Sequence, residues 1–117
     1  MSKKISIAID AMGGDNSPNK TIEGIKFFLD KNDKNDDFTL NIFGKEQELT
    51  ELLSKYNISS SNIKIFNSNT VVSDDEKPIT AVKNSKNTSM WNCINHQLEG
   101  KSDISLSAGN TGVLLVI

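Results

Sequence analysis

Two glycine-containing loops carry most of the side chains in this sequence that could bind a ligand. The loop at residues 107–112 reads Ser-Ala-Gly-Asn-Thr-Gly and precedes an apolar stretch. Glycines let backbone N–H groups approach an anion closely, and a helix N-terminus adds a partial positive charge. Residues 107–112, the second of the two loops along the chain, therefore predict a phosphate site. An ordinary helix cap and turn is an equally open interpretation. Its candidate residues are Ser107, Gly109, Asn110, Thr111 and Gly112.

The first loop, residues 10–15, places two carboxylates around a glycine pair, and its candidates are Asp10, Gly13, Gly14 and Asp15. The carboxylates could orient a substrate, bind a divalent cation or only cap the loop. The spacing is not the G-x-G-x-x-G of a dinucleotide site, and Asp15 would repel a pyrophosphate. A nicotinamide-dependent enzyme is therefore disfavoured.

Lysine is the only basic residue that could help to hold phosphate, because the sequence contains no arginine. Lysines act as point charges and cannot form the bidentate fork of arginine. Near the acidic stretch at residues 74–76, Lys77, Lys83 and Lys86 are the candidates for steering an anion, with a merely solvated loop as the alternative. Cys93 and His96 stand three residues apart, so a thiolate–imidazole pair is conceivable, but packing is the favoured interpretation.

The bulk composition is that of a globular protein. The 117 residues are 36% hydrophobic and 24% charged, and the net charge of -2 argues against nucleic-acid binding. One cysteine excludes an internal disulfide and suggests a reducing compartment. No apolar run reaches the roughly 18 residues of a membrane span. We therefore expect a cytoplasmic protein, with peripheral association at the membrane as an open alternative.

Alternating strands and helices predict a three-layer α/β fold with a mostly parallel sheet and helices on both faces. Ser17 and Pro18 suggest a helix start, Asn87 or Thr88 can cap a later helix, and Gly100 can end it. The expected strands are residues 5–9, 38–43, 63–66 and 104–107. The expected helices are residues 18–31, 46–56, a stretch opening at Pro78, and residues 89–99.

The end of the sequence is unusual for a complete domain. An apolar stretch, residues 113–117, begins after the second loop and stops within about two helical turns. A naturally short helix that packs on the sheet is one interpretation. We expect instead that residues 1–117 are the N-terminal part of a single α/β domain, truncated after the fourth strand.

Three motifs together resemble the phosphate acyltransferases of bacterial phospholipid synthesis, the acyl-carrier-protein:phosphate transacylases. They are Ile-Ala-Ile-Asp-Ala-Met-Gly-Gly-Asp-Asn-Ser-Pro at residues 7–18, Asp-Glu-Lys-Pro at residues 75–78, and the second loop. The order and spacing of the motifs match over residues 5–117. Two features depart from the family pattern. Asn84 and Ser85 interrupt a cluster that is usually basic, and family members continue well beyond residue 117.

The resemblance implies a reaction in which inorganic phosphate attacks the thioester of an acyl group on acyl carrier protein. The acyl phosphate would feed a glycerol-3-phosphate acyltransferase at the membrane, and the full-length protein would be a homodimer. No cofactor or metal is implied, and Asp10, Gly13, Gly14, Asp15 and Lys77 would line the cleft. We expect the chain to be too short for activity alone. A non-catalytic remnant that binds phosphate or a partner chain, and an independent phosphate- or nucleotide-binding module, remain as alternatives.

Overall fold

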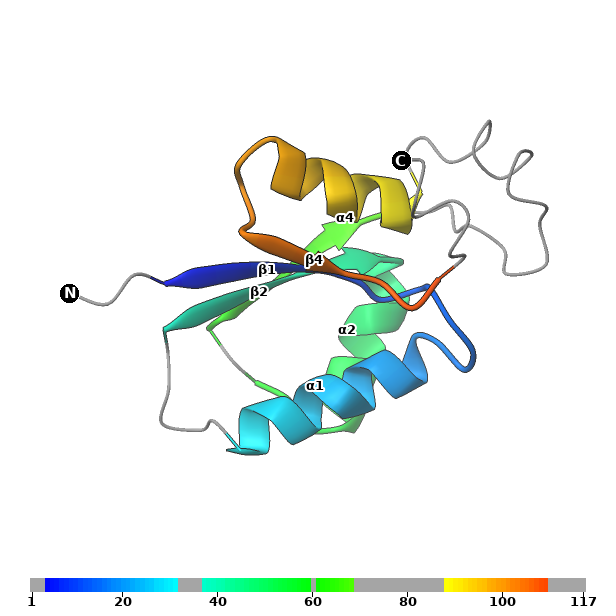
Figure 1. Cartoon of the computed structure of the whole chain (residues 1–117). Coiled ribbons are helices and arrows are strands. Elements are labelled where there is room, and N and C mark those ends of the chain that lie inside the picture. The colour runs from blue at the N-terminus through cyan, green and yellow to red at the C-terminus, as the bar shows by residue number, and fades with distance from the viewer. Residues whose placement is uncertain (1–3, 32–36, 60, 69–87, 110–117) are drawn as a thin grey trace.

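The computed structural model of the chain describes residues 4–31, 37–59, 61–68 and 88–109. Four parallel strands form one sheet in the order β3-β2-β1-β4 (Figure 1). The strands are β1 (Ile5–Asp10), β2 (Phe38–Gly44), β3 (Ile63–Asn67) and β4 (Ile104–Leu106). Each lies within one residue of the position expected from the sequence, so the α/β class and the parallel sheet are confirmed.

Helices cover both faces of the sheet, as expected. Helices α1 (Asn19–Lys31) and α2 (Glu46–Lys55) lie on one face, and α4 (Ser89–Leu98) lies on the other (Figure 1). The helix expected to open at Pro78 falls outside the described residues. No helix in the described part of the chain is both long and apolar enough to cross a membrane.

Alternation along the strands divides the core between the two faces, because successive side chains of a strand point in opposite directions. On the α1 and α2 face, Leu40 and Ile42 are buried against Ile22, Ile25 and Leu49. On the α4 face, Ala8, Phe43 and Cys93 form a smaller buried cluster. A side chain's position along its strand therefore decides which helix it meets, and this alternation directs Asp10 toward α4.

The two ends of α4 are fixed by the residues that the sequence suggested. The Thr88 hydroxyl accepts a hydrogen bond from the Trp91 N–H at 3.2 Å, which satisfies one free donor of the first turn. At the other end Gly100 has φ of 79°, and the Lys101 N–H donates to the His96 carbonyl at 2.9 Å. This Schellman arrangement uses the left-handed conformation that glycine adopts at little cost. The start of α4 is thereby held at a defined place above the sheet.

The start of α1 differs in detail from the expectation. The helix begins at Asn19, and the Ser17 hydroxyl donates back to the carbonyl oxygen of Gly13. Asn16 has φ of 60°, so the chain reverses direction just before the helix. Ser17 therefore ties the first loop to the beginning of α1.

The strand order places the two loops side by side. The chain passes from β1 to β2 to β3 in one direction and then returns to the opposite side of β1 to form β4. The strand order therefore reverses between β1 and β4, where Ile9 pairs with Leu106. Open parallel sheets bind ligands outside the carboxyl ends of the strands at this kind of switch point.

Candidate functional site

Asp10, the last residue of β1, is the centre of the hydrogen bonds that join the two loops. It is almost completely buried, with 3% of its surface exposed. Its Oδ1 accepts hydrogen bonds from the Ser89 hydroxyl at 2.6 Å and from the Met12 N–H at 3.2 Å. Its Oδ2 accepts from the Ser107 hydroxyl at 2.8 Å. One carboxylate thus contacts the first loop, the start of α4 and the second loop.

The surroundings of Asp10 compensate for the burial of its charge. An isolated carboxylate is costly to remove from water, whereas one that accepts several hydrogen bonds is tolerated. Ser89 is the first residue of α4, so the carboxylate also lies at the positive end of the helix dipole. The donors and the dipole together offset the cost of burying the side chain, which orients the hydroxyl groups around it.

The backbones of the two loops are in close contact. A methyl group on Gly13 would lie 2.6 Å from Asp10 Oδ2 and 2.9 Å from the backbone nitrogen of Gly109. At Gly14, which has φ of 90°, a Cβ would lie 2.9 Å from the Ala108 Cβ. These positions require glycine because a side chain would force the loops apart.

Ser107 links Asp10 to the backbone of its own loop. Its hydroxyl donates to Asp10 and accepts a hydrogen bond from the Gly109 N–H at 3.1 Å. The proton of Ser107 and the N–H of Gly109 are therefore both engaged within the protein. In this arrangement Ser107 holds the second loop in a turn, so the donors for a bound anion would have to come from elsewhere along the two loops.

Several residues expected at the site are brought together, and others are not described. Asp10, Gly13, Gly14, Ser107 and Gly109 form one contiguous group. Asp15 is also described and lies in an exposed part of the first loop. The remaining candidates lie outside the described residues; they are Lys77, Lys83, Lys86, Asn110, Thr111 and Gly112.

Sequence reasoning missed the start of α4 as part of this group. Ser89 is buried and donates to Asp10, and Met90 lies under the second loop, where its Cε would be 2.5 Å from a Cβ on Gly109. The sequence does indicate where this helix begins, because Asn87 or Thr88 can cap it. What the sequence lacked was the position of that helix relative to the carboxyl ends of β1 and β4.

The thiolate–imidazole pair allowed by the spacing of Cys93 and His96 is not formed. Burial, and then the negative charge of Asp10, raise the pKa of the Cys93 thiol to about 12. His96 instead places its Nδ1 2.6 Å from the Ser102 hydroxyl and packs its ring against Phe66. Cys93 is therefore a packing residue beneath the site, as favoured from the sequence.

Comparison with known proteins gives a consistent result over nearly the whole chain. A family described as "Fatty acid synthesis protein" matches residues 5–117. A phosphate acyltransferase of Pelagibacter ubique is 43% identical over 117 residues, which is 100% of this chain and 34% of that protein.

More distant relatives carry the same name. The phosphate acyltransferase of Ehrlichia ruminantium is 38% identical over 97% of this chain and 33% of its own length. That of Clostridium acetobutylicum is 34% identical over 93% of this chain and 32% of its own length. The chain thus spans about a third of the length of the curated relatives it matches.

Proposed function

Because the chain belongs to the family of fatty acid synthesis proteins, we propose that it forms the phosphate-binding wall of an acyltransferase. The proposed reaction moves a fatty acyl group from acyl carrier protein to inorganic phosphate and gives an acyl phosphate for phospholipid synthesis. Relatives named phosphate acyltransferase support the acyl-transfer part of this proposal. The remaining two-thirds of such an enzyme would supply the opposite wall of the cleft.

The observation that carries the proposal is the connection between Asp10 and Ser107. It joins the two glycine loops at the point where the strand order of the sheet reverses. Loops at that point present backbone N–H groups to a ligand, which suits an anion. In a segment without arginine, backbone donors are a main resource for holding phosphate.

In the proposed reaction, an oxygen of bound phosphate attacks the thioester carbonyl carbon and a tetrahedral oxyanion forms. The carbon–sulfur bond then breaks, and the carrier leaves as a thiolate that takes up a proton. Such chemistry depends on holding phosphate next to the carbonyl and on donors for the oxyanion. As written, it uses no metal or cofactor.

Asp10 would act as a positioning residue in this scheme. A carboxylate in direct contact with phosphate would repel it, and both oxygens of Asp10 already accept hydrogen bonds. Its proposed task is to fix Ser107, and with it the direction of the second loop. Lys77 and Lys86 would contribute positive charge, and Asn110, Thr111 and Gly112 would complete the anion site.

The proposed partners follow from this reaction. Acyl carrier protein and inorganic phosphate would be the substrates, and the product would pass to a membrane glycerol-3-phosphate acyltransferase. The full-length protein would act as a homodimer in the cytoplasm or at the membrane surface. No nucleic-acid partner is proposed, because the chain is slightly acidic.

A chimeric enzyme tests the proposal. Residues 1–117 of this chain replace the matching third of the Pelagibacter ubique phosphate acyltransferase, to which they are 43% identical. Acyl phosphate formed from acyl carrier protein thioester and phosphate is trapped with hydroxylamine and quantified. We expect turnover by the chimera and a large loss in its Asp10→Ala variant. A folded chimera without turnover, beside an active parent enzyme, would support a non-catalytic segment instead.

A further inference from the structure

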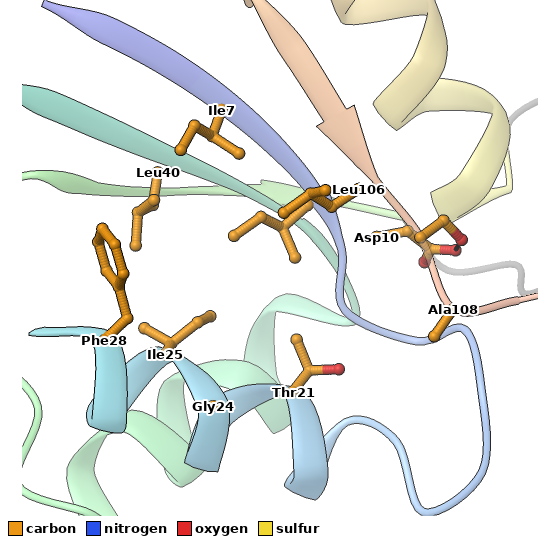
Figure 2. A pocket seen from close by; sticks show the side chains of 11 residues that line it. Ile7, Asp10, Thr21, Gly24, Ile25, Phe28, Leu40, Leu106 and Ala108 are labelled. Atoms are coloured by element: carbon orange, nitrogen blue, oxygen red, sulfur yellow. Dashed lines mark hydrogen bonds between the residues drawn. The ribbon is translucent and has the colours of Figure 1, made fainter.

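An apolar groove of about 440 Å³ lies between α1 and the β1–β4 side of the sheet (Figure 2). Ile7, Leu40 and Leu106 face it from the sheet, and Ile25 and Phe28 face it from the helix (Figure 2). We call this feature the α1 groove. Its volume lies within the range of small-molecule sites, which are mostly apolar with a few polar groups at one end.

The α1 groove is open rather than filled by side chains. Leu106 is 54% exposed and Phe28 is 37% exposed, although both are large and apolar. Gly24 lines the groove from the middle of α1, and a Cβ added there would meet no atom within 4 Å. A glycine inside a helix is less stable than an alanine at the same place. At this position the glycine leaves space beside the sheet.

One end of the α1 groove is formed by the candidate functional site. Asp10 and Ala108 line that end, next to Thr21 at the beginning of α1 (Figure 2). Ser107, which donates a hydrogen bond to Asp10, lines the same end. The carboxylate of Asp10 is turned toward α4, where it accepts the hydrogen bond of Ser89. The interior of the groove is therefore lined by uncharged side chains, while its end meets the two loops.

These features favour an alkyl chain as the occupant. The polar side chains among the described lining residues are Asp10, Thr21 and Ser107, and they lie at the end that meets the loops. The other described lining residues are apolar, and burying an alkyl chain against isoleucine, leucine and phenylalanine is favourable. A thioester held at the loops would place its alkyl chain at the mouth of this groove.

We propose that the α1 groove binds the fatty acyl chain of the thioester substrate, with its carbonyl carbon at the two loops and its methyl end toward Phe28. This inference rests on the proposed function and assigns the part of the substrate that the loops do not contact. The chain length that fits is set by the span from Thr21 to Phe28, seven residue steps that rise about 10 Å along the helix.

The test uses S-acyl N-acetylcysteamine thioesters with acyl chains of four, six, eight and ten carbons, kept below their micelle concentrations. Binding to the 117-residue chain is followed by NMR of isoleucine and leucine methyl groups. Each added methylene is expected to tighten binding roughly fourfold until the chain passes Phe28. The shifted methyls are expected to be those of Ile7, Ile25 and Leu106, with Ile94 on α4 unaffected.

Gly24→Leu fills the groove without a backbone clash. This variant is expected to abolish the dependence of thioester affinity on acyl-chain length. Leu106→Lys places a charge in the groove at an exposed position and serves as a second variant that should still fold. Asp30→Leu is the matched control, because it adds a leucine to α1 and, among the described residues, breaks an exposed ion pair with Lys26. It should bind like the original chain.

Three results would overturn the inference. They are a folded chain that binds none of the thioesters, methyl shifts away from the groove, and unchanged binding in both Gly24→Leu and Leu106→Lys. Failure of the proposed function is detected separately in the chimera. If the chimera turns over with a chain-length preference that Gly24→Leu does not alter, the groove assignment alone is refuted. If the chimera without that substitution forms no acyl phosphate, the proposed reaction is refuted.

Discussion

The hydroxyl oxygen of Ser89 lies 2.6 Å from Oδ1 of Asp10, so the first residue of α4 is hydrogen-bonded to the last residue of β1. The second oxygen of the same carboxylate holds Ser107 after β4. One side chain thereby holds two serines that lie 79 and 97 positions away from it along the chain. This carboxylate therefore connects the first loop, the second loop and the start of α4.

Replacing Ser89 by alanine removes a buried hydrogen bond to a charged group. Ser89→Ala is expected to lower the free energy of unfolding by about 1.5–3 kcal/mol, measured by urea denaturation. Ser105→Ala is the control, since it removes an exposed hydrogen bond between Ser105 and Gln97 on the same face of the sheet. If the two variants lose the same stability, the contact with Ser89 does not hold the site together.

Alanine substitutions at two glycines should have opposite effects on stability. In Gly13→Ala the new methyl group would meet Asp10 Oδ2 at 2.6 Å and the Gly109 backbone at 2.9 Å, so a loss of about 1–3 kcal/mol is expected. In Gly24→Ala the methyl group meets nothing within 4 Å, and a gain of about 0.5–1 kcal/mol is expected from helix propensity. Thermal and urea unfolding measure the change in the free energy of unfolding in both variants. A destabilised Gly24→Ala, or an unaffected Gly13→Ala, would contradict the packing described here.

The strands and helices could be predicted from the sequence because their signals are local. Short runs rich in apolar or β-branched residues marked the strands, Gly44 closed the second of them, and Thr88 and Gly100 marked the ends of α4. The strand order could not be read in the same way, because it depends on which strand returns beside β1. The contact between Ser89 and Asp10 follows only from that order, and for this reason sequence reasoning found the two loops and missed the serine.

The individual site residues also differ in whether a local sequence signal or tertiary packing reveals their role. Asp10 and Gly13 stood out by residue type and spacing, and both lie where the loops meet. The role of Ser107 was less accessible, because its hydroxyl is committed to Asp10 by tertiary packing. The α1 groove also had no sequence signal, since Gly24 in a helix and Leu106 in a strand acquire a shared surface only after folding.

The stability of the chain should fall as the solution is made mildly acidic. Burial, and then the nearby Lys101, lower the pKa of His96 from its usual value of 6.5. The unfolded chain then takes up a proton more readily than the folded chain as the pH falls below about 6.5, and this favours unfolding. Urea denaturation between neutral pH and the lowered pKa measures the effect.

The matched variant for this pH dependence is His96→Gln, which removes the titrating ring. Its stability should change less with pH over the same interval. An identical pH profile in the variant would show that a group other than His96 causes the effect.

The thiol of Cys93 should react slowly with alkylating reagents in the folded chain. Its pKa rises from 9.0 to about 12, so the thiolate fraction at pH 8 falls by about a thousandfold even before access is considered. Mass spectrometry after timed iodoacetamide treatment, with and without urea, measures the difference. Equal rates in both conditions would show that Cys93 is not held in the core beneath Asp10.

A titration of the 117-residue chain with inorganic phosphate, followed by NMR of backbone amides, tests whether the two loops bind phosphate. A dispersed spectrum establishes that the chain is folded. We expect saturable shifts at Gly13, Gly14 and residues 110–112, which are weakened in Asp10→Ala and preserved in the Asp30→Leu control. If the loop amides of a folded chain do not respond to phosphate, or respond no more than amides on the far side of α2, the two loops do not form a phosphate site.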